Sequence, residues 1–500
     1  MPVKKERCIS IVVLLFRHIC LVVGTYLFCG KGGIKMPVNS FLDYPMTWRP
    51  QKQSLKRPIY RSLADQLEAD IRAGILAPGT KLPPQRELAD FLDINFTTVT
   101  RTYKLCEMRG LVYAKTGRGT FVSRHAAQPI TISAVQAPHA CIDLAFVASF
   151  EQCNYMVTDA VRKVTEKKYF EKLLDYGDPS GMPHHKKAGI RWMQQFGMTA
   201  EEEQTAVVSG ALNAVALTFF ALFEAGDRIA VDSYTFTNFI ELAKLYHLHL
   251  TPVAGDLEGM LPEELDMQCR RNRVKGIFLM PSCSNPTTVT MTEERKRELA
   301  TVIKKHRLIL IEDDICAFLT AGVLEDDRGP VSRFVREQSV YICSTSKAIC
   351  SGLRIAYLVF GEKFRDDILR AVYNVNVKTS ALNAEIVTEL LMSGKADEII
   401  AEKRRLAKEA NQLFHRYFPE APPSGHPLSF FRWLPITGRE RGLTAEKKYE
   451  KAGVRVYHSD RFLSGEASED QYLRISLATA DSLEQLRFGL DILRRALDEQ

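Results

Sequence analysis

The feature that most constrains this 500-residue chain is a series of apolar segments of strand length beyond residue 140. These segments read TAVVSG, DRIAVD, VKGIFLMPS, RLILIEDD and IAYLVFG, and helical segments such as ALNAVALTFFALFEAG separate most of them. Continuous apolar strands that alternate with helices are typical of a parallel sheet covered on both faces. We therefore expect an α/β domain over residues 141–500, with ligands at the carboxyl ends of its strands.

Residues 57–123 have a different pattern and predict a separate α+β unit. Apolar residues recur at spacing four within RPIYRSLADQLEADIRAGIL, which predicts a helix. QRELADFLDI and FTTVTRTYKLCEMRG predict two more helices, and LVYAKTGRGTFVS predicts two strands around a glycine turn. Helices joined by a tight turn and followed by a hairpin indicate a winged helix-turn-helix.

The third of these helices offers polar groups suited to a DNA major groove. The formal charge of +7 is mild for the whole chain, but residues 81–125 carry eight Lys and Arg against four Asp and Glu. We expect base or groove contacts at the helix start and phosphate contacts around it. The first set is Asn95, Thr97, Thr98, Thr100 and Arg101, and the second is Arg86, Lys104, Lys115 and Arg118.

The segment LPPQRELADFLDINFTTVTRTYKLCEMRGLVYAKTGRGTFV resembles the DNA-binding domain of the GntR family of bacterial transcription regulators. The resemblance carries the LPPxRELA box, the TTVxR of the recognition helix and the GRGTFV wing. It implies that Arg86, Asn95, Thr97, Thr98, Thr100 and Gly119 meet DNA. Phe96 stands where many relatives have a polar or basic residue, so the resemblance does not indicate which operator sequence the domain prefers.

Polar groups follow the predicted strands of the large domain in an order that indicates one ligand. Ser209-Gly210-Ala211 opens a helix and can bind an anion, while Ser344, Ser346 and Arg354 surround Lys347. A lysine buried beside a cation loses its proton readily and becomes a nucleophile. With an acid for a ring nitrogen (one of Glu312, Asp313 and Asp314), an amide for a ring oxygen and an aromatic ring for stacking, the set describes pyridoxal phosphate.

Residues 141–500 resemble a fold-type I aminotransferase, the pyridoxal phosphate family that includes the aspartate and 2-aminoadipate aminotransferases. The stretch STSKAICSGLRIAYLV is similar to the family signature SxSKxxxPGLRxGY, and YGDPSG, VSGALNAVAL, GDRIAVDSYTF, NPTT, IEDDICAFL and YLRISLA match other family segments. The resemblance implies a mostly parallel sheet with a small C-terminal α+β subdomain.

The resemblance also implies roles for individual residues. Lys347 binds the cofactor covalently, and Arg474 binds a substrate carboxylate. The phosphate is held by Ser344, Ser346, Arg354, the backbone of Ala211 and Leu212, and Tyr176 of a neighbouring subunit. Phe236 stacks on the ring, Asn285 bonds its phenolic oxygen, and Asp313, or as second choice Asp314, pairs with the ring nitrogen.

Several residues depart from the family pattern around the cofactor. Ile315 stands where the family has a tyrosine that bonds the cofactor, and Thr288, Ser351 and Ala356 replace a glycine, a proline and a glycine. His185-Lys186 replaces the usual Leu-Arg. We expect cofactor binding to survive these changes, whereas efficient transamination is in doubt.

The remaining segments bear on location. Residues 1–56 are expected to be an N-terminal extension whose apolar part, residues 8–29, lies upstream of the folded protein; a single-span anchor is the alternative. Residues 124–140 are expected to be a linker. The eleven scattered cysteines form no CxxC pair, which favours reduced thiols in a cytoplasmic protein without a metal site.

A GntR-type DNA-binding domain joined to an aminotransferase-like domain resembles the MocR/GabR subfamily of regulators. The resemblance implies a head-to-tail homodimer on a double-stranded DNA operator, with pyridoxal phosphate on Lys347 sensed directly or used to detect an amino-acid or amine effector. The alternatives are an active 2-aminoadipate aminotransferase-like enzyme that carries a GntR-type domain, and a regulator that no longer binds the cofactor. We expect no membrane partner and weak or no turnover.

Overall fold

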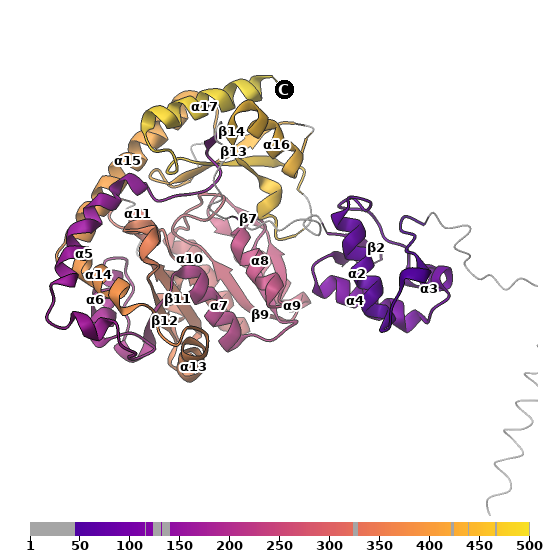
Figure 1. The fold of residues 1–500 in the computed structure, drawn as a ribbon, viewed down its shortest axis with the longest axis horizontal. Coiled ribbons are helices and arrows are strands. Elements are labelled where there is room, and N and C mark those ends of the chain that lie inside the picture. Colours follow the sequence, from indigo (N-terminus) through magenta and orange to yellow (C-terminus); the bar gives the residue numbers. More distant parts are fainter. Residues whose placement is uncertain are drawn as a thin grey trace, which may run out of the picture.

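The computed structural model describes residues 46–115, 117–123, 132, 141–323, 329–421, 425–438, 440–465 and 468–499 (Figure 1). The expectations for residues 1–45 and for nearly all of the linker lie outside the described residues. No helix within these ranges is both long enough and apolar enough to cross a membrane. The eight cysteines they contain are free thiols.

The N-terminal unit has the predicted helices and hairpin (Figure 1). One apolar face of each helix is buried in a shared core, which includes Leu63, Leu88, Val99 and Tyr103. Trp48 joins the same core, and its indole N–H donates to Asp70 at 2.8 Å. The elements are η1 (Lys52–Ser54), α2 (Ile59–Arg72), α3 (Gln85–Leu92), α4 (Phe96–Met108), β1 (Val112–Lys115) and β2 (Gly119–Val122).

A seven-stranded sheet of order β4-β12-β11-β10-β9-β5-β6 forms the centre of the large domain. Neighbours are parallel except that β12 is antiparallel to both β11 and β4, so the sheet is mostly parallel as predicted. Only the short segment 345–355 joins β11 to β12, whereas a parallel crossover usually needs a helix. The strands are β4 (Thr205–Val208), β5 (Arg228–Asp232), β6 (His249–Val253), β9 (Val274–Leu279), β10 (Ile309–Asp313), β11 (Ser339–Ser344) and β12 (Ala356–Phe360).

Helices cover both faces of this sheet because alternate strand residues point to opposite sides. Val340 and Ile342 pack with α7, α8 and α13 on one face. Tyr341 and Cys343 join the core of α5, α6 and α14 on the other, and α9 and α10 cover that face further along. The helices are α5 (Thr158–Thr165), α6 (Pro183–Gln194), α7 (Ala211–Leu222), α8 (Thr237–Leu245), α9 (Pro262–Arg271), α10 (Glu293–His306), α13 (Arg365–Asn376) and α14 (Ala381–Met392).

The chain ends in the small α+β subdomain that was predicted (Figure 1). It is built on the antiparallel sheet β13-β16-β15, beside which β14 pairs with β3 (Ile142–Asp143). Its elements are α15 (Lys395–Tyr417), β13 (Phe431–Ile436), α16 (Gly442–Ala452), β14 (Val454–Arg455), β15 (Tyr457–His458), η9 (Ser459–Phe462), β16 (Gln471–Ser476) and α17 (Leu483–Asp498).

Short elements complete the large domain. They are η2 (Glu151–Val157), η3 (Phe170–Leu173), η4 (Glu202–Gln204), β7 (Gly255–Asp256), β8 (Gly259–Met260), α11 (Ala317–Thr320), η5 (Val331–Phe334), η6 (Arg336–Gln338), α12 (Thr345–Ala348), η7 (Ser351–Leu353) and η8 (Glu362–Phe364).

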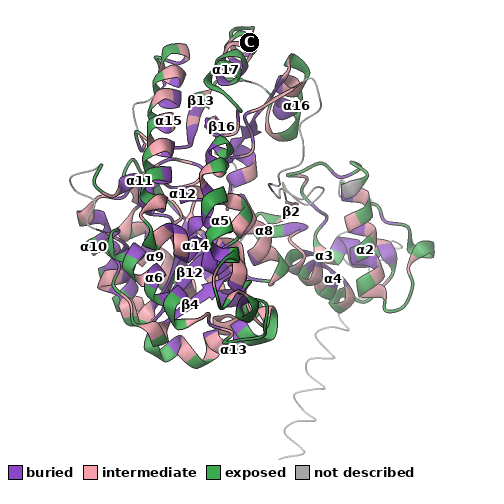
Figure 2. Cartoon of the chain, turned by 60° about the vertical axis from the view of Figure 1, so that its left-hand side comes forward, coloured by how far each residue is buried: buried purple, intermediate pink, exposed green. Residues whose placement is uncertain are grey.

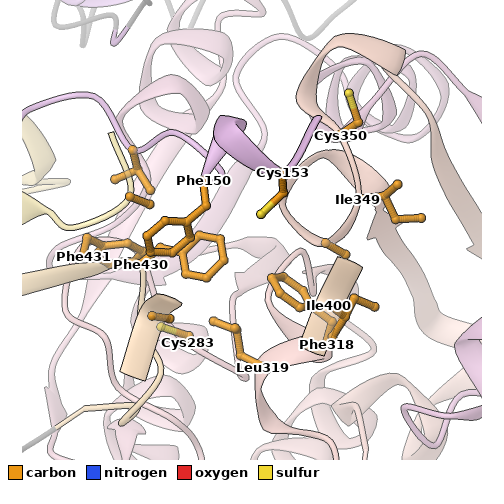
Figure 3. Close-up of a cluster of buried hydrophobic side chains, with 14 of the residues drawn as sticks. Phe150, Cys153, Cys283, Phe318, Leu319, Ile349, Cys350, Ile400, Phe430 and Phe431 are labelled. Atoms are coloured by element: carbon orange, nitrogen blue, oxygen red, sulfur yellow. The ribbon is translucent and has the colours of Figure 1, made fainter. Parts of the chain in front are cut away.

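One continuous core joins the subdomain to the sheet domain, as the buried interior in Figure 2 and the close-up in Figure 3 show. Phe430, next to β13, lies at its centre and contacts Phe150 and Phe318 edge to face, with ring centroids 4.8 and 5.7 Å away. These rings come from three distant stretches of sequence. The core therefore fixes the subdomain against the carboxyl ends of the strands, where the candidate site lies.

Candidate functional site

A cavity of about 320 Å³ lies where β9, β10 and β11 end, and the subdomain closes its far side. Most of the residues predicted to bind the cofactor or substrate line it. They are Ala211, Leu212, Phe236, Asn285, Asp313, Ser344, Ser346, Lys347, Arg354 and Arg474. Tyr176 lies outside the cavity and is 91% exposed.

Lys347 lies on the single turn α12, directly after β11. Its ammonium group donates to the backbone carbonyl of Val147 and, at 3.2 Å, to that of Ala148. Burial lowers the pKa of the lysine to about 8, and the nearby cations Arg474 and Lys403 add to this effect. An amine with this pKa is partly neutral near physiological pH and can attack an aldehyde.

Hydroxyl and guanidinium groups next to Lys347 in the sequence form a cradle for an anion in the same cavity. Arg354 donates to the Ser346 hydroxyl at 3.0 Å, and that hydroxyl lies 3.2 Å from the Ser344 hydroxyl. Gly210 precedes α7 with a φ of 93°, and a Cβ added there would lie 2.4 Å from the guanidinium of Arg354. The glycine thus keeps room between Arg354 and the start of α7, where backbone N–H groups favour an anion.

Asp313 ends β10, and its Oδ1 is buried without a hydrogen-bond partner in the described part of the chain. Burial raises the pKa of its carboxyl to about 7, and the neighbouring Asp314 adds to the shift. Asp314, the second choice of the sequence analysis, does not line the cavity and accepts from Tyr341 at 3.2 Å. Asp313 is therefore the carboxylate that faces the cavity without a partner on one oxygen.

Glu312, the first acid of the same run, turns away from this site. Its carboxylate accepts from the backbone N–H groups of Val331 and Ser332, each at 2.7 Å. The three consecutive acids are thus separated, because successive side chains of a strand point in opposite directions.

Arg474 and Asn285 form a hydrogen-bonded pair on the subdomain side of the cavity. Arg474 donates to the Asn285 side-chain oxygen at 2.9 Å and to the Ala145 carbonyl at 2.7 Å. Because that bond uses the amide oxygen, the amide nitrogen of Asn285 remains the donor available to a ligand. Burial lowers the pKa of Arg474 to about 9.

Some features of the cavity were not predicted from the sequence. Phe146, Phe430 and Phe431 contribute to its walls, and the carbonyl oxygens of Val147 and Ala148 hold the lysine. These residues belong to segments without a recognisable motif, so only their packing reveals them. Ile315, where the resemblance has a tyrosine, also lines the cavity and offers it an apolar surface.

The candidate DNA-binding residues lie on α3, at the N-cap and first turns of α4, and in the hairpin. Arg86, Asn95, Thr97, Arg101, Arg118 and Gly119 are exposed, whereas Thr98 and Thr100 are half-buried. Asn95 is also the N-cap of α4, and its side-chain oxygen accepts from the Thr97 N–H at 2.8 Å. Thr100 donates to Gln85 at 2.8 Å. Several predicted DNA contacts therefore also shape the start of the recognition helix.

Two family profiles match the chain. The aminotransferase class I and II family matches residues 147–487, and the bacterial regulatory proteins of the gntR family match residues 59–122. The chain belongs to both families. It thus joins a GntR DNA-binding domain to an aminotransferase domain, consistent with the MocR/GabR subfamily named from its motifs.

Curated relatives share this two-domain arrangement over nearly their whole length. The uncharacterized HTH-type transcriptional regulator YdeF of Bacillus subtilis is 35% identical over 468 residues, which cover 93% of this chain and all of YdeF. The vitamin B6 salvage pathway transcriptional repressor PtsJ of Salmonella typhimurium is 25% identical over 439 residues, covering 86% of this chain and 96% of PtsJ.

Solved structures of aminotransferases show the same fold for the large domain. An archaeal alanine:glyoxylate aminotransferase superposes with a TM-score of 0.66 at 19% identity and covers 73% of this chain and 92% of the enzyme. LysN, the α-aminoadipate aminotransferase of Thermus thermophilus, also gives 0.66, at 21% identity and 74% and 96% coverage. The fold binds pyridoxal phosphate, and the cavity suits it through the glycine-lined anion cradle and the unpaired Asp313 oxygen.

Proposed function

We propose that this GntR aminotransferase-domain protein is a transcription regulator that carries pyridoxal phosphate on Lys347. It responds either to the cofactor itself or to an amino compound that competes with Lys347 for the cofactor. The observation that carries the proposal is the convergence of Lys347, Asp313 and the Arg354 cradle on one cavity, in a chain that also has an exposed recognition helix. The name of the PtsJ relative, a repressor of vitamin B6 salvage, supports the cofactor as a sensed molecule.

Each residue of the cavity would have a distinct task in this function. Arg354, Ser344, Ser346 and the start of α7 would bind the phosphate, and Asp313 would hold a proton on the ring nitrogen. Asn285 would donate to the phenolic oxygen, Phe236 would stack on the ring, and Arg474 would bind the carboxylate of an amino acid. The cofactor, once bound, supplies an electrophilic carbon that amines attack.

The signal would reach DNA through the whole chain. A head-to-tail homodimer would present two recognition helices to two half-sites of an operator. Tyr176 would complete the neighbouring subunit's phosphate site, which agrees with its exposure outside its own cavity. An amino compound that displaces Lys347 would shift the balance between two arrangements of the dimer.

The test is fluorescence anisotropy on DNA from the promoter region of this gene. The protein is titrated without cofactor, with pyridoxal phosphate, and with the cofactor plus a panel of amino acids and amines. We expect affinity for one DNA segment to change with the cofactor, and Lys347→Ala to abolish that change while keeping basal DNA binding. Sequence-specific binding that ignores the cofactor in the native chain would contradict the proposal.

An aminotransferase is the second candidate, because Lys347, Asp313, Asn285 and Arg474 line one cavity in the arrangement that transamination requires. Ile315 disfavours it, since an isoleucine cannot hydrogen-bond the cofactor. Single-turnover production of pyridoxamine phosphate from a panel of amino acids distinguishes the two. Fast turnover without specific DNA binding would favour the enzyme.

A further inference from the structure

A second cavity, of about 510 Å³, lies beside the cofactor cavity at the carboxyl ends of β5 and β6. Its other wall comes from β13 and β16 of the small subdomain. Met280 lines both cavities, and no other described residue does. None of the predicted cofactor or substrate residues lines the second cavity, so the proposed function does not use it.

Three aromatic side chains form one wall of this cavity. Trp433 and Tyr472 are stacked, with ring centroids 4.9 Å apart and planes 13° from parallel. Tyr234 packs edge to face against both, at 5.4 and 5.9 Å. The stacking follows from the strand register, because Trp433 lies opposite Arg474 and Tyr472 lies two residues from Arg474 on the same face.

The charged side chains that line the cavity are all acidic. Asp232, Asp256 and Asp470 line it, and no lysine, arginine or histidine does so among the described residues. Asp256 is neutralised by Arg295, which donates to both of its carboxylate oxygens at 2.9 Å. Asp470 is exposed at the rim.

Asp232 has no such partner. It ends β5, and within the part of the chain that the structure describes its carboxylate makes no hydrogen bond or ion pair. Burial raises the pKa of this carboxyl to about 7, and no other group contributes to the shift. A half-buried carboxylate that lines a cavity without a partner is stabilised by a cation brought from outside.

The two cavities therefore differ in the charge of the ligand they suit. The cofactor cavity contains Lys347, Arg354 and Arg474 and favours phosphate and carboxylate groups. The second cavity combines π faces with an unpaired carboxylate, the combination that binds ammonium groups.

We propose that the second cavity binds a small organic cation, an amine or quaternary ammonium ion, independently of the cofactor. The ammonium group would lie against the rings of Trp433, Tyr472 and Tyr234 and pair with Asp232. A cavity of this volume falls within the usual range for small-molecule ligands. Choline is a quaternary ammonium ion small enough for this cavity.

The test is calorimetric titration of the full-length holoprotein with choline and with its neutral isostere 3,3-dimethyl-1-butanol. We expect one choline site per chain and binding of the neutral alcohol weaker by about tenfold or more. Asp232→Asn should weaken choline binding by at least about tenfold, and Trp433→Leu by a similar factor, while Trp433→Phe should retain part of it. The absorbance of the bound cofactor monitors folding in each variant.

Two controls separate this site from the cofactor site. Lys347→Ala, which removes cofactor attachment, should bind choline as the native chain does. Asp366→Asn removes one exposed carboxylate of α13, a helix that does not line the cavity, and should also leave binding unchanged. The proposal is overturned if choline and the alcohol bind alike, if no binding occurs at millimolar choline, or if Lys347→Ala abolishes it. Binding that survives Asp232→Asn would overturn it equally.

Discussion

At the scale of single residues, the cofactor cavity holds ionisable groups at pKa values displaced toward neutrality. Lys347 is shifted down and Asp313 up, each mainly by burial. Opposite shifts of an amine and an acid share one cause, because a low dielectric disfavours whichever form carries the charge. Both displacements can be tested by changing the pH.

The rate of cofactor attachment should follow the neutral form of Lys347. The neutral amine is the attacking form, so the rate of attachment should rise with pH and level off above about 8, the folded pKa. An ordinary lysine would still be gaining rate at pH 9, since its pKa is about 10.4. Stopped-flow absorbance across this range measures the profile, and a rate that keeps climbing past pH 9 would contradict the shifted pKa.

Asp313 should make the cofactor-free protein less stable as the pH rises. Its folded pKa of about 7 exceeds the ordinary value of 3.8, so the unfolded chain releases this proton at lower pH. The free energy of unfolding should therefore fall between about pH 4 and 7, by at most about 4 kcal/mol from this group. Asp313→Asn should reduce the fall of the unfolding free energy with pH and raise the midpoint of urea unfolding at pH 7. An unchanged dependence on pH would refute the raised pKa of Asp313.

At the scale of elements, turns and helix starts determine the two functional surfaces. Gly210 leaves room for Arg354 before α7, and Asn95 caps the recognition helix α4. Both are single positions where backbone geometry shapes a proposed binding surface.

Gly210→Ala should weaken cofactor binding by about tenfold or more, because the new Cβ would lie 2.4 Å from the Arg354 guanidinium. Gly226→Ala is the matched control, since Gly226 has a φ of 95°, close to the 93° of Gly210, but nothing within 4 Å of an added Cβ. Gly226→Ala introduces backbone strain without a clash with a neighbouring side chain, so this variant should bind the cofactor normally. Fluorescence titration of the cofactor-free protein measures both, and equal losses would mean that strain is the cause.

Asn95→Ala should cost the N-terminal unit about 1 kcal/mol of stability through loss of the N-cap. Asn95→Ser should keep the cap and most of that stability. If Asn95 also contacts DNA, both variants should weaken operator binding in an anisotropy titration, whereas a purely structural role predicts that serine restores it. Thermal melting of the full chain gives the stability of each.

At the scale of the whole molecule, the proposed homodimer would complete the candidate site with residues from both subunits. Tyr176 lies on the surface, outside the cavity of its own chain, and was predicted to serve the cavity of a neighbouring subunit. The proposed homodimer would bring it to the partner's phosphate cradle.

Mixing two defective variants tests this arrangement. Lys347→Ala and Tyr176→Phe should each bind the cofactor poorly, the second by about tenfold less than the native chain because one phosphate hydrogen bond is lost. Mixed dimers would contain one intact site, with Lys347 from one chain and Tyr176 from the other. Tight binding should therefore return in part on mixing, and its absence would mean that Tyr176 does not act across subunits.

Much of this fold could be predicted because its signals are local. The apolar stripe on α2 and the apolar strands beyond residue 140 both follow from spacing within short windows. The antiparallel pairing of β12 was not predicted, because the sequence of one strand does not show whether it runs parallel or antiparallel to its neighbours. The contacts of Trp48 with the N-terminal core also escaped prediction, since an isolated aromatic residue carries no periodicity.

The sequence by itself determined the chemistry available to this protein: the order of strands and helices, the lysine between two serines and an arginine, and the recognition helix. The tertiary structure decided which of these groups meet. It faced Asp313 toward the cavity and bonded Asp314 to Tyr341, joined Arg474 to Asn285, and made Asp232 and three aromatic rings line one cavity. The physical reason is that burial and partners, which set a charged group's behaviour, come from residues distant in sequence and near only after folding.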